Sequence, residues 1–324
     1  MGGYDSSRTG RTRQRKKEEG KTVPTEITFS ELETFGVCPW QWYARYVLLK
    51  RPKRKSVKLH FGGAIHKGIE AFYTRQGDPL AVVADYCNWV RQEAVQNGTP
   101  LDDEYDLTLK KSLIMMEAYV ARYAGDFDLY NILSVEPKFS IPLTPEITIS
   151  GKIDRIVTEK RTGMFFPVES KTAAQWNPDV NRLMLDFQIS LYSWAVSKLL
   201  SLQDVTFLYD VMRKPAIRLK KNETEADFLI RLKENVIGEP GEYFFRDKIT
   251  RSRREIDRTE REILIRSKEL LEKRQNLQIY RTPGDHCHWR CDYMPPCLED
   301  TPEMWDTLYT TVETPHEELL PVPE

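Results

Sequence analysis

Five side chains between Asp154 and Tyr192 could act together on a phosphate ester. They comprise two carboxylates, an ammonium group and two neutral polar groups: Asp154, Glu169, Lys171, Gln188 and Tyr192. Mg²⁺ prefers oxygen ligands, and one or two carboxylates with waters and a substrate phosphate satisfy it. A neighbouring lysine can orient the attacking hydroxide or neutralise charge in the transition state. The set therefore suits metal-assisted hydrolysis of a phosphodiester.

The sequence around these residues predicts a strand–strand–helix unit. Apolar runs at 147–157 and 164–168 predict two strands joined by a turn at 160–163. Asp154 lies in the first strand, and Glu169 and Lys171 end the second on one face, because residues i and i+2 of a strand point to the same side. The following segment is predicted to be a helix, which places Gln188 and Tyr192 one turn apart.

Taken singly, these residues are weak evidence of function. Carboxylates and lysines at strand ends are often solvated or paired across strands. A Glu-x-Lys motif alone is a weak signal. The fixed order of all five residues within one structural unit is far more specific.

The order of these motifs resembles that of a known enzyme family. Residues 151–155 read Gly-Lys-Ile-Asp-Arg, residues 169–171 read Glu-Ser-Lys, and residues 188–192 read Gln-Ile-Ser-Leu-Tyr. The pattern resembles the PD-(D/E)xK nuclease superfamily, within it the RecB-like and CRISPR-associated exonuclease branch, over most of the chain. The resemblance implies an α/β, restriction-endonuclease-like core, with a mixed central sheet flanked by helices and extended by helical additions.

The resemblance also implies roles for the site residues. Asp154 and Glu169 would bind one or two Mg²⁺ or Mn²⁺ ions, and Lys171 would position the nucleophile. Gln188 and Tyr192 would shape the DNA groove and hydrogen-bond phosphate or water.

A histidine on an early helix is the next candidate ligand. A lone histidine is more often structural, but the family has one in a Gly-x-x-x-His context, which residues 62–66 match. The resemblance thus implies that His66 completes the metal shell, and an imidazole ligand would suit Mn²⁺ better than Mg²⁺. Glu70, one turn later, stays outside the predicted set. Glu136 is either a further acidic group near the site or, as we expect, a solvated strand charge.

The cysteines predict a metal site rather than disulfides. Their number, five, is odd, and three lie within eleven residues near the end of the chain. Four thiolates can hold a 4Fe–4S cluster or Zn²⁺, and spacing alone leaves both open, with His286 or His288 as further zinc ligands. The resemblance favours a structural iron–sulfur cluster with one early and three late ligands, which are Cys38, Cys287, Cys291 and Cys297. The spacing between Cys287 and Cys291 is one residue longer than is usual in the family. Cys87, in an apolar helical stripe, is expected to be structural.

Charge is concentrated locally rather than over the whole chain. The net charge is −1, so overall charge does not mark a nucleic-acid binder. The segment 45–58 carries only basic charges, and either DNA-backbone contact or a solvated loop would explain it. The DNA-binding candidates in it are Arg51, Lys53, Arg54 and Lys55.

Composition predicts three segments. They are a disordered basic tail at 1–24, a central segment at 25–300, and a loose acidic tail at 301–324. The resemblance implies that the central segment is the nuclease domain. No apolar run reaches the length of a membrane span and the start is not a secretory signal. We therefore expect an intracellular, cytoplasmic protein, in the host cytoplasm if phage-encoded, with no membrane partner.

Local patterns predict further elements. A helix is expected to start with Ser30 as N-cap and Glu33 completing a capping box. Helices are expected over 79–126, with apolar stripes that form core, and over most of 223–277. Strands are expected at 132–143 and 205–213.

The leading hypothesis is a metal-dependent deoxyribonuclease. We expect an exonuclease acting on DNA ends or single strands in recombination, repair or phage DNA processing, with a helicase or recombination protein as its partner. The alternative is a catalytically inactive DNA-binding or scaffold subunit of the same fold. A third reading is a zinc-stapled interaction protein, which zinc without iron would favour.

Overall fold

The computed structural model describes residues 24–54, 56–99, 101–174, 183–289, 291–299 and 301–320. The basic tail predicted at 1–24 lies outside these ranges except for Pro24. Lys55 also lies outside them.

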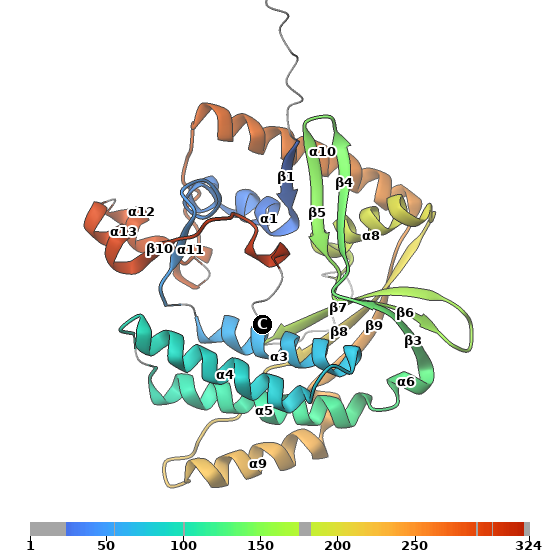
Figure 1. The fold of residues 1–324 in the computed structure, drawn as a ribbon, viewed down its shortest axis with the longest axis vertical. Coiled ribbons are helices and arrows are strands. Elements are labelled where there is room, and N and C mark those ends of the chain that lie inside the picture. The colour runs from blue at the N-terminus through green and yellow to red at the C-terminus, as the bar shows by residue number, and fades with distance from the viewer. Residues whose placement is uncertain are drawn as a thin grey trace, which may run out of the picture.

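Two sheets form the centre of the fold (Figure 1). In the larger sheet β7 and β8 pair in parallel and the other neighbours are antiparallel, so the sheet is mixed. Its spatial order is β3 (Tyr130–Val135), β6 (Arg155–Glu159), β7 (Phe165–Ala173), β8 (Val205–Arg213) and β9 (Phe244–Arg251). The smaller sheet has the order β1 (Thr25–Thr28), β5 (Ile147–Lys152) and β4 (Lys138–Thr144).

Helices cover one face of the larger sheet (Figure 1). They are α3 (Val57–Thr74), α4 (Pro79–Gln96), α5 (Asp103–Tyr123) and α9 (Glu225–Gly238). The apolar stripes predicted within 79–126 form this core, in which Val83, Leu109 and Met116 are buried. Cys87 is buried among them, with its Sγ 3.7 Å from the Leu109 carbonyl oxygen, as a structural residue would be.

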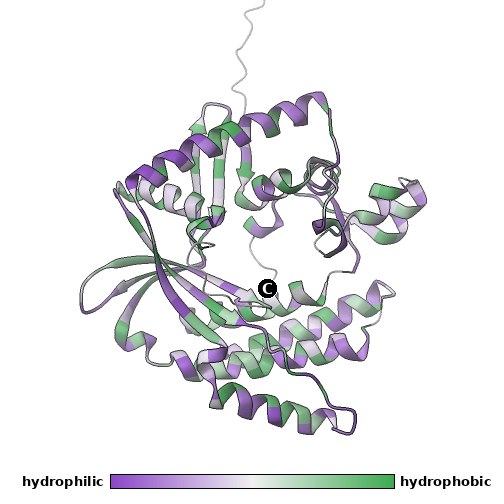
Figure 2. Cartoon of the chain, turned by 180° about the vertical axis from the view of Figure 1, so that it is seen from behind, coloured by the Kyte–Doolittle hydropathy of each residue, from purple (hydrophilic) through white to green (hydrophobic). Residues whose placement is uncertain are grey.

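A second core joins the smaller sheet to the helices above it. These helices are α1 (Phe29–Val37), α8 (Phe187–Leu200) and α10 (Arg253–Asn276). Along α10 hydrophilic residues predominate in Figure 2, whereas Ile256, Ile263 and Leu270 form its buried stripe. Among the described helices none is long and apolar enough to span a membrane.

The remaining elements are short. They are α2 (Pro39–Trp42), η1 (Tyr43–Val47), β2 (Lys50–Pro52), α6 (Asp126–Leu129), η2 (Pro240–Glu242), α11 (His286–Trp289), α12 (Met294–Leu298), α13 (Pro302–Leu308), β10 (Tyr309–Thr311) and η3 (Glu317–Leu319).

Two predicted strands are each divided in the structure. The run at 147–157 forms β5 and β6, which belong to different sheets, and Asp154 lies at the bend between them. The run at 132–143 likewise forms β3 and β4, with Glu136 at the junction in the left-handed region (φ 54°). The chain passes from one sheet to the other at both points, and an apolar run looks the same on either side of such a crossing.

One local prediction was wrong, and another, although right for most of its segment, did not foresee a strand. The N-cap of α1 is Thr28, not Ser30, because β1 ends there with extended backbone and the Thr28 hydroxyl accepts from the Glu31 N–H. Within the segment 223–277, predicted to be mostly helical, Phe244–Arg251 forms strand β9, because it pairs along nearly the whole length of β8. The strand predicted at 205–213 is confirmed as β8.

The prediction of a loose acidic tail was wrong for residues 301–320. Strand β10 pairs with β2, and the side chain of His316 is buried against Glu31, with 3.4 Å between Nε2 and Oε2. The carboxylate of Glu317 pairs with Arg51 at 2.6 Å. Composition cannot reveal such partners, since they come from the other end of the chain.

Candidate active site

Strand β7 places Glu169 and Lys171 side by side. Alternation along the strand points both to one face, and Lys171 Nζ lies 2.6 Å from Glu169 Oε1. The Glu169 residue is only 2% exposed, whereas about a third of the Lys171 side chain is accessible. The ammonium group of Lys171 therefore lies between solvent and the buried carboxylate of Glu169.

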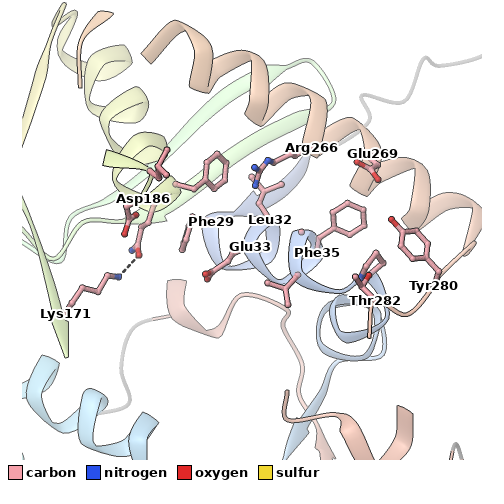
Figure 3. Close-up of a pocket in the computed structure, with 16 residues that line it drawn as sticks. Phe29, Leu32, Glu33, Phe35, Lys171, Asp186, Arg266, Glu269, Tyr280 and Thr282 are labelled. Carbon is pink, nitrogen blue, oxygen red and sulfur yellow. Dashed lines mark hydrogen bonds between the residues drawn. The ribbon is translucent and has the colours of Figure 1, made fainter. Parts of the chain in front are cut away.

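Helix α8 adds Gln188 to this pair. The helix begins after Asp186, whose carboxylate accepts from the Ile189 N–H at 3.0 Å and fixes the first turn. The Gln188 amide donates to Glu169 Oε1 at 2.7 Å and accepts from Lys171, the bond dashed in Figure 3. Glu169, Lys171 and Gln188 thus form a closed hydrogen-bonded triangle.

Asp154 lies beside the triangle because of the bend between β5 and β6. Its Oδ2 accepts from the Ser170 N–H at 2.6 Å, and Ser170 separates Glu169 from Lys171. On the other side, His66 Nδ1 on α3 lies 3.8 Å from the same oxygen. The structure therefore brings His66, Asp154 and the Glu169 strand to one place.

Tyr192 is one turn beyond Gln188, but its ring is part of the core. The ring centroids of Phe29 and Phe139 lie 6.3 Å and 5.6 Å away. A Cβ atom at Gly151 would come within 3.3 Å of the Tyr192 ring. Burial also raises the pKa of the phenol. The ring supports the position of α8 rather than lining open surface.

The pKa shifts of Glu169 and His66 indicate that a cation would stabilise the charged form of the buried carboxylate. Burial raises the pKa of Glu169 to about 8, although the Lys171 charge opposes this. Glu169 Oε2 is buried and has no hydrogen-bond partner among the described residues. Burial lowers the pKa of His66, which favours the neutral imidazole that binds metals.

These donors fit a hard divalent cation. Mg²⁺ is usually bound by one or two carboxylates together with water and substrate phosphate. Glu169 Oε2, which has no hydrogen-bond partner among the described residues, can act as one metal ligand. Within the described ranges no three His, Cys, Asp or Glu residues are grouped closely enough to hold a metal by themselves. The chain therefore offers a partial ligand set that solvent or substrate would have to complete.

One nearby acid departs from the sequence expectation. Glu136 is not a solvated strand charge: it is partly buried, pairs with Lys152, and its N–H donates to the Asp154 carbonyl at 2.8 Å. Burial raises its pKa, and the charges of Asp154 and Glu70 add to the effect. The signal in the sequence was Pro137 directly after it, which marks a break in the strand.

A buried polar network behind the sheet was not foreseen. Arg155 donates to the Ser170 hydroxyl at 2.9 Å and pairs with Asp210 on β8. Asp210 also accepts from Tyr119 at 2.6 Å and from Arg246 at 3.0 Å. The network fixes strand β7 at Ser170 from the face opposite to Glu169 and Lys171.

The four cysteines predicted as iron–sulfur ligands, Cys38, Cys287, Cys291 and Cys297, lie in one region of the structure. All are free thiols, Cys38 is buried at the junction of α1 and α2, and the other three come from the chain around α11 and α12. Burial raises the pKa of Cys291 to about 11, and the charges of Cys38, Cys287 and Cys297 contribute to this. Cys87 lies apart, in the core beside α5.

The basic run has a structural role where it is described. Arg51 is 5% exposed and donates to Glu317 and to the Pro315 carbonyl, so its prediction as a DNA contact was wrong. Lys53 donates to the Asp306 carbonyl at 2.7 Å, and Arg54 pairs with Asp102 at 3.1 Å. Arg51 and Lys53 hold the C-terminal segment, which the sequence pattern could not indicate.

The chain belongs to the PD-(D/E)XK nuclease superfamily, whose family model matches residues 26–298. The mixed α/β architecture agrees with the restriction-endonuclease-like core expected of that family. A solved structure from Eubacterium rectale, provisionally named an exonuclease, is 12% identical, with 90% of this chain and 93% of that chain covered and a TM-score of 0.45. No curated protein matches this chain.

Proposed function

We propose that this chain is a metal-dependent deoxyribonuclease of the RecB-like branch. It would act as an exonuclease on DNA ends or single strands in recombination, repair or phage DNA processing. The observation that carries the proposal is the triangle of Glu169, Lys171 and Gln188 beside Asp154. It combines a second carboxylate and a partly accessible ammonium group with a buried carboxylate, one oxygen of which has no hydrogen-bond partner among the described residues.

The residues have distinct roles in this proposal. Asp154, Glu169 and His66 would hold Mg²⁺ or Mn²⁺, which when bound supplies Lewis-acid activation of water and phosphate. The Lys171 ammonium neutralises negative charge that develops on the phosphate during hydrolysis. Gln188 keeps Lys171 and Glu169 aligned through two hydrogen bonds, and the Ser170 N–H keeps Asp154 in place.

The four gathered cysteines would hold a structural 4Fe–4S cluster, with Zn²⁺ as the alternative. Thiolates are ligands for both, and in a reducing compartment free clustered cysteines favour metal binding over disulfides. Such a centre would join α2 to the chain around α11 and α12 within the nuclease domain at 25–300. Iron and zinc analysis of protein purified without oxygen separates the two metals.

The test of the activity uses end-labelled single-stranded and duplex DNA with Mg²⁺, Mn²⁺ or EDTA. Glu169→Gln, which keeps the size of the side chain and removes its charge, is the control for contaminating nucleases. We expect metal-dependent cleavage that the variant abolishes. Folded, metal-loaded wild-type protein without cleavage would overturn the proposal and favour a DNA-binding subunit, whose partner would be a helicase or recombination protein.

A further inference from the structure

A groove of about 900 Å³ leads away from the candidate active site (Figure 3). It begins at Lys171 and Gln188 and runs between α1 and α10 to Tyr280 and Thr282. We call it the α1–α10 groove. Its continuity with the Glu169–Lys171–Gln188 triangle means that a molecule in the groove could extend to the reacting atoms.

The far end of the groove carries an exposed aromatic ring. Tyr280 is 51% exposed, and its carbonyl oxygen accepts from the Trp40 N–H at 3.1 Å, which anchors the backbone to α2. Nearer the triangle, the half-buried rings of Phe29 and Phe187 line the wall with their centroids 6.0 Å apart. The groove therefore offers aromatic surface at both ends.

Arg266 supplies a cation between these ends. Its guanidinium lies over the Phe187 ring at 4.2 Å and has no carboxylate partner in the described part of the chain. The facing residue on α1 is Gly36, where an added Cβ would lie 3.8 Å from Arg266 Nη1. Because α1 has no side chain there, the guanidinium stays open to the groove.

The groove also contains acids, and these limit what it can bind. Glu33 and Glu269 face it, whereas the Asp186 carboxylate caps α8. The positive charges of Lys171 and Arg266 nearly balance these acids. The groove therefore does not attract polyanions in general by its charge. Its affinity for a ligand must come largely from contacts with the faces of its aromatic rings.

We propose that the α1–α10 groove binds the unpaired end of a DNA strand, the part adjacent to the phosphate at Lys171. This inference rests on the proposed function. A base of the strand stacks on Tyr280, and a backbone phosphate contacts Arg266. Within a duplex the bases are stacked and paired with each other, so away from the duplex ends only an unpaired strand can present a base face to a protein ring. The groove thus makes Tyr280 and Arg266 determinants of single-strand preference.

The test measures binding in the Glu169→Gln background, where cleavage cannot interfere. Tyr280→Ala and Arg266→Ala should each weaken binding of a fluorescent single-stranded oligonucleotide by about 5-fold or more, and Tyr280→Phe should not. Arg266→Ala should also reduce the slope of log affinity against log salt by about 0.7. Arg261→Ala, which removes the same charge from α10 outside the groove, should change nothing, and none of the variants should alter blunt-duplex binding.

Cleavage assays separate this inference from the proposed function. In the otherwise native enzyme, Tyr280→Ala and Arg266→Ala should raise KM for single strands, whereas Arg261→Ala should leave it at the wild-type value. If the wild type cleaves but both variants match Arg261→Ala in binding and KM, the groove inference is wrong. If the wild type cleaves nothing while Tyr280 and Arg266 still govern oligonucleotide binding, the activity is wrong and the groove assignment holds.

Discussion

The Ser170 N–H donates to Asp154 Oδ2 at 2.6 Å, and the Ser170 hydroxyl accepts from Arg155 at 2.9 Å. Ser170 thus links the candidate site on one face of the larger sheet to the buried Arg155–Asp210 pair on the other. A disturbance of that pair should reach Asp154 directly through Arg155, its neighbour in the chain, and should reach Glu169 and Lys171 through Ser170.

Replacing Lys171 tests its role in hydrolysis. Lys171→Ala should lower the cleavage rate by at least about 100-fold, since a group that stabilises transition-state charge is removed. The measurement is the single-turnover rate, with circular dichroism and iron content as checks that the fold is intact. A purified variant with near wild-type rate would remove Lys171 from the mechanism.

Breaking the buried network should cost much stability. Asp210→Asn leaves Arg155 and Arg246 buried without their shared carboxylate, which should lower the free energy of unfolding by about 3–5 kcal/mol. Denaturant titration measures this change. The control is Asp247→Asn, at an exposed position of the neighbouring strand β9, where we expect a change within about 0.5 kcal/mol. Equal effects of the two substitutions would contradict the network's importance.

His316 should make stability depend on pH. Although burial alone would lower it, the pKa of His316 is raised above 6.5 by the carboxylate of Glu318, 3.8 Å from Nδ1, and by that of Glu31, 3.4 Å from Nε2. Because the pKa is higher in the folded than in the unfolded protein, protonation of His316 contributes its full stabilisation at pH values below the unfolded-state pKa of 6.5. This stabilisation is lost as the pH rises through the folded-state pKa. Unfolding free energies at about pH 6 and about pH 8.5 should differ more in the wild type than in His316→Gln. The same pH difference in both proteins would refute the prediction.

The cysteines allow a matched comparison. Cys38→Ser should lower the bound iron and the melting temperature, because Cys38 brings α2 to the three late cysteines. Cys87→Ser, in the core beside α5, should keep wild-type iron content. Metal analysis of anaerobically purified proteins measures both. Loss of iron from the Cys87 variant alone would show that the proposed ligand set is wrong.

Much of the candidate site could be predicted from the sequence. The alternation rule placed Glu169 and Lys171 on one face, and the helical period placed Gln188 one turn before Tyr192. The apolar stripes within 79–126 likewise form core. These features follow from local geometry, since strand and helix periods depend only on the chain near each residue.

The sequence by itself determined which residues could do the chemistry and in what order they occur. Tertiary structure alone decided that 147–157 divides between two sheets, that Glu136 lies beside Asp154, and that Arg51 is buried under residues 315–317. It also formed the α1–α10 groove from segments more than two hundred residues apart. Strand pairing, ion pairing and burial depend on partners distant in the chain, and a local pattern carries no information about which partner will be present.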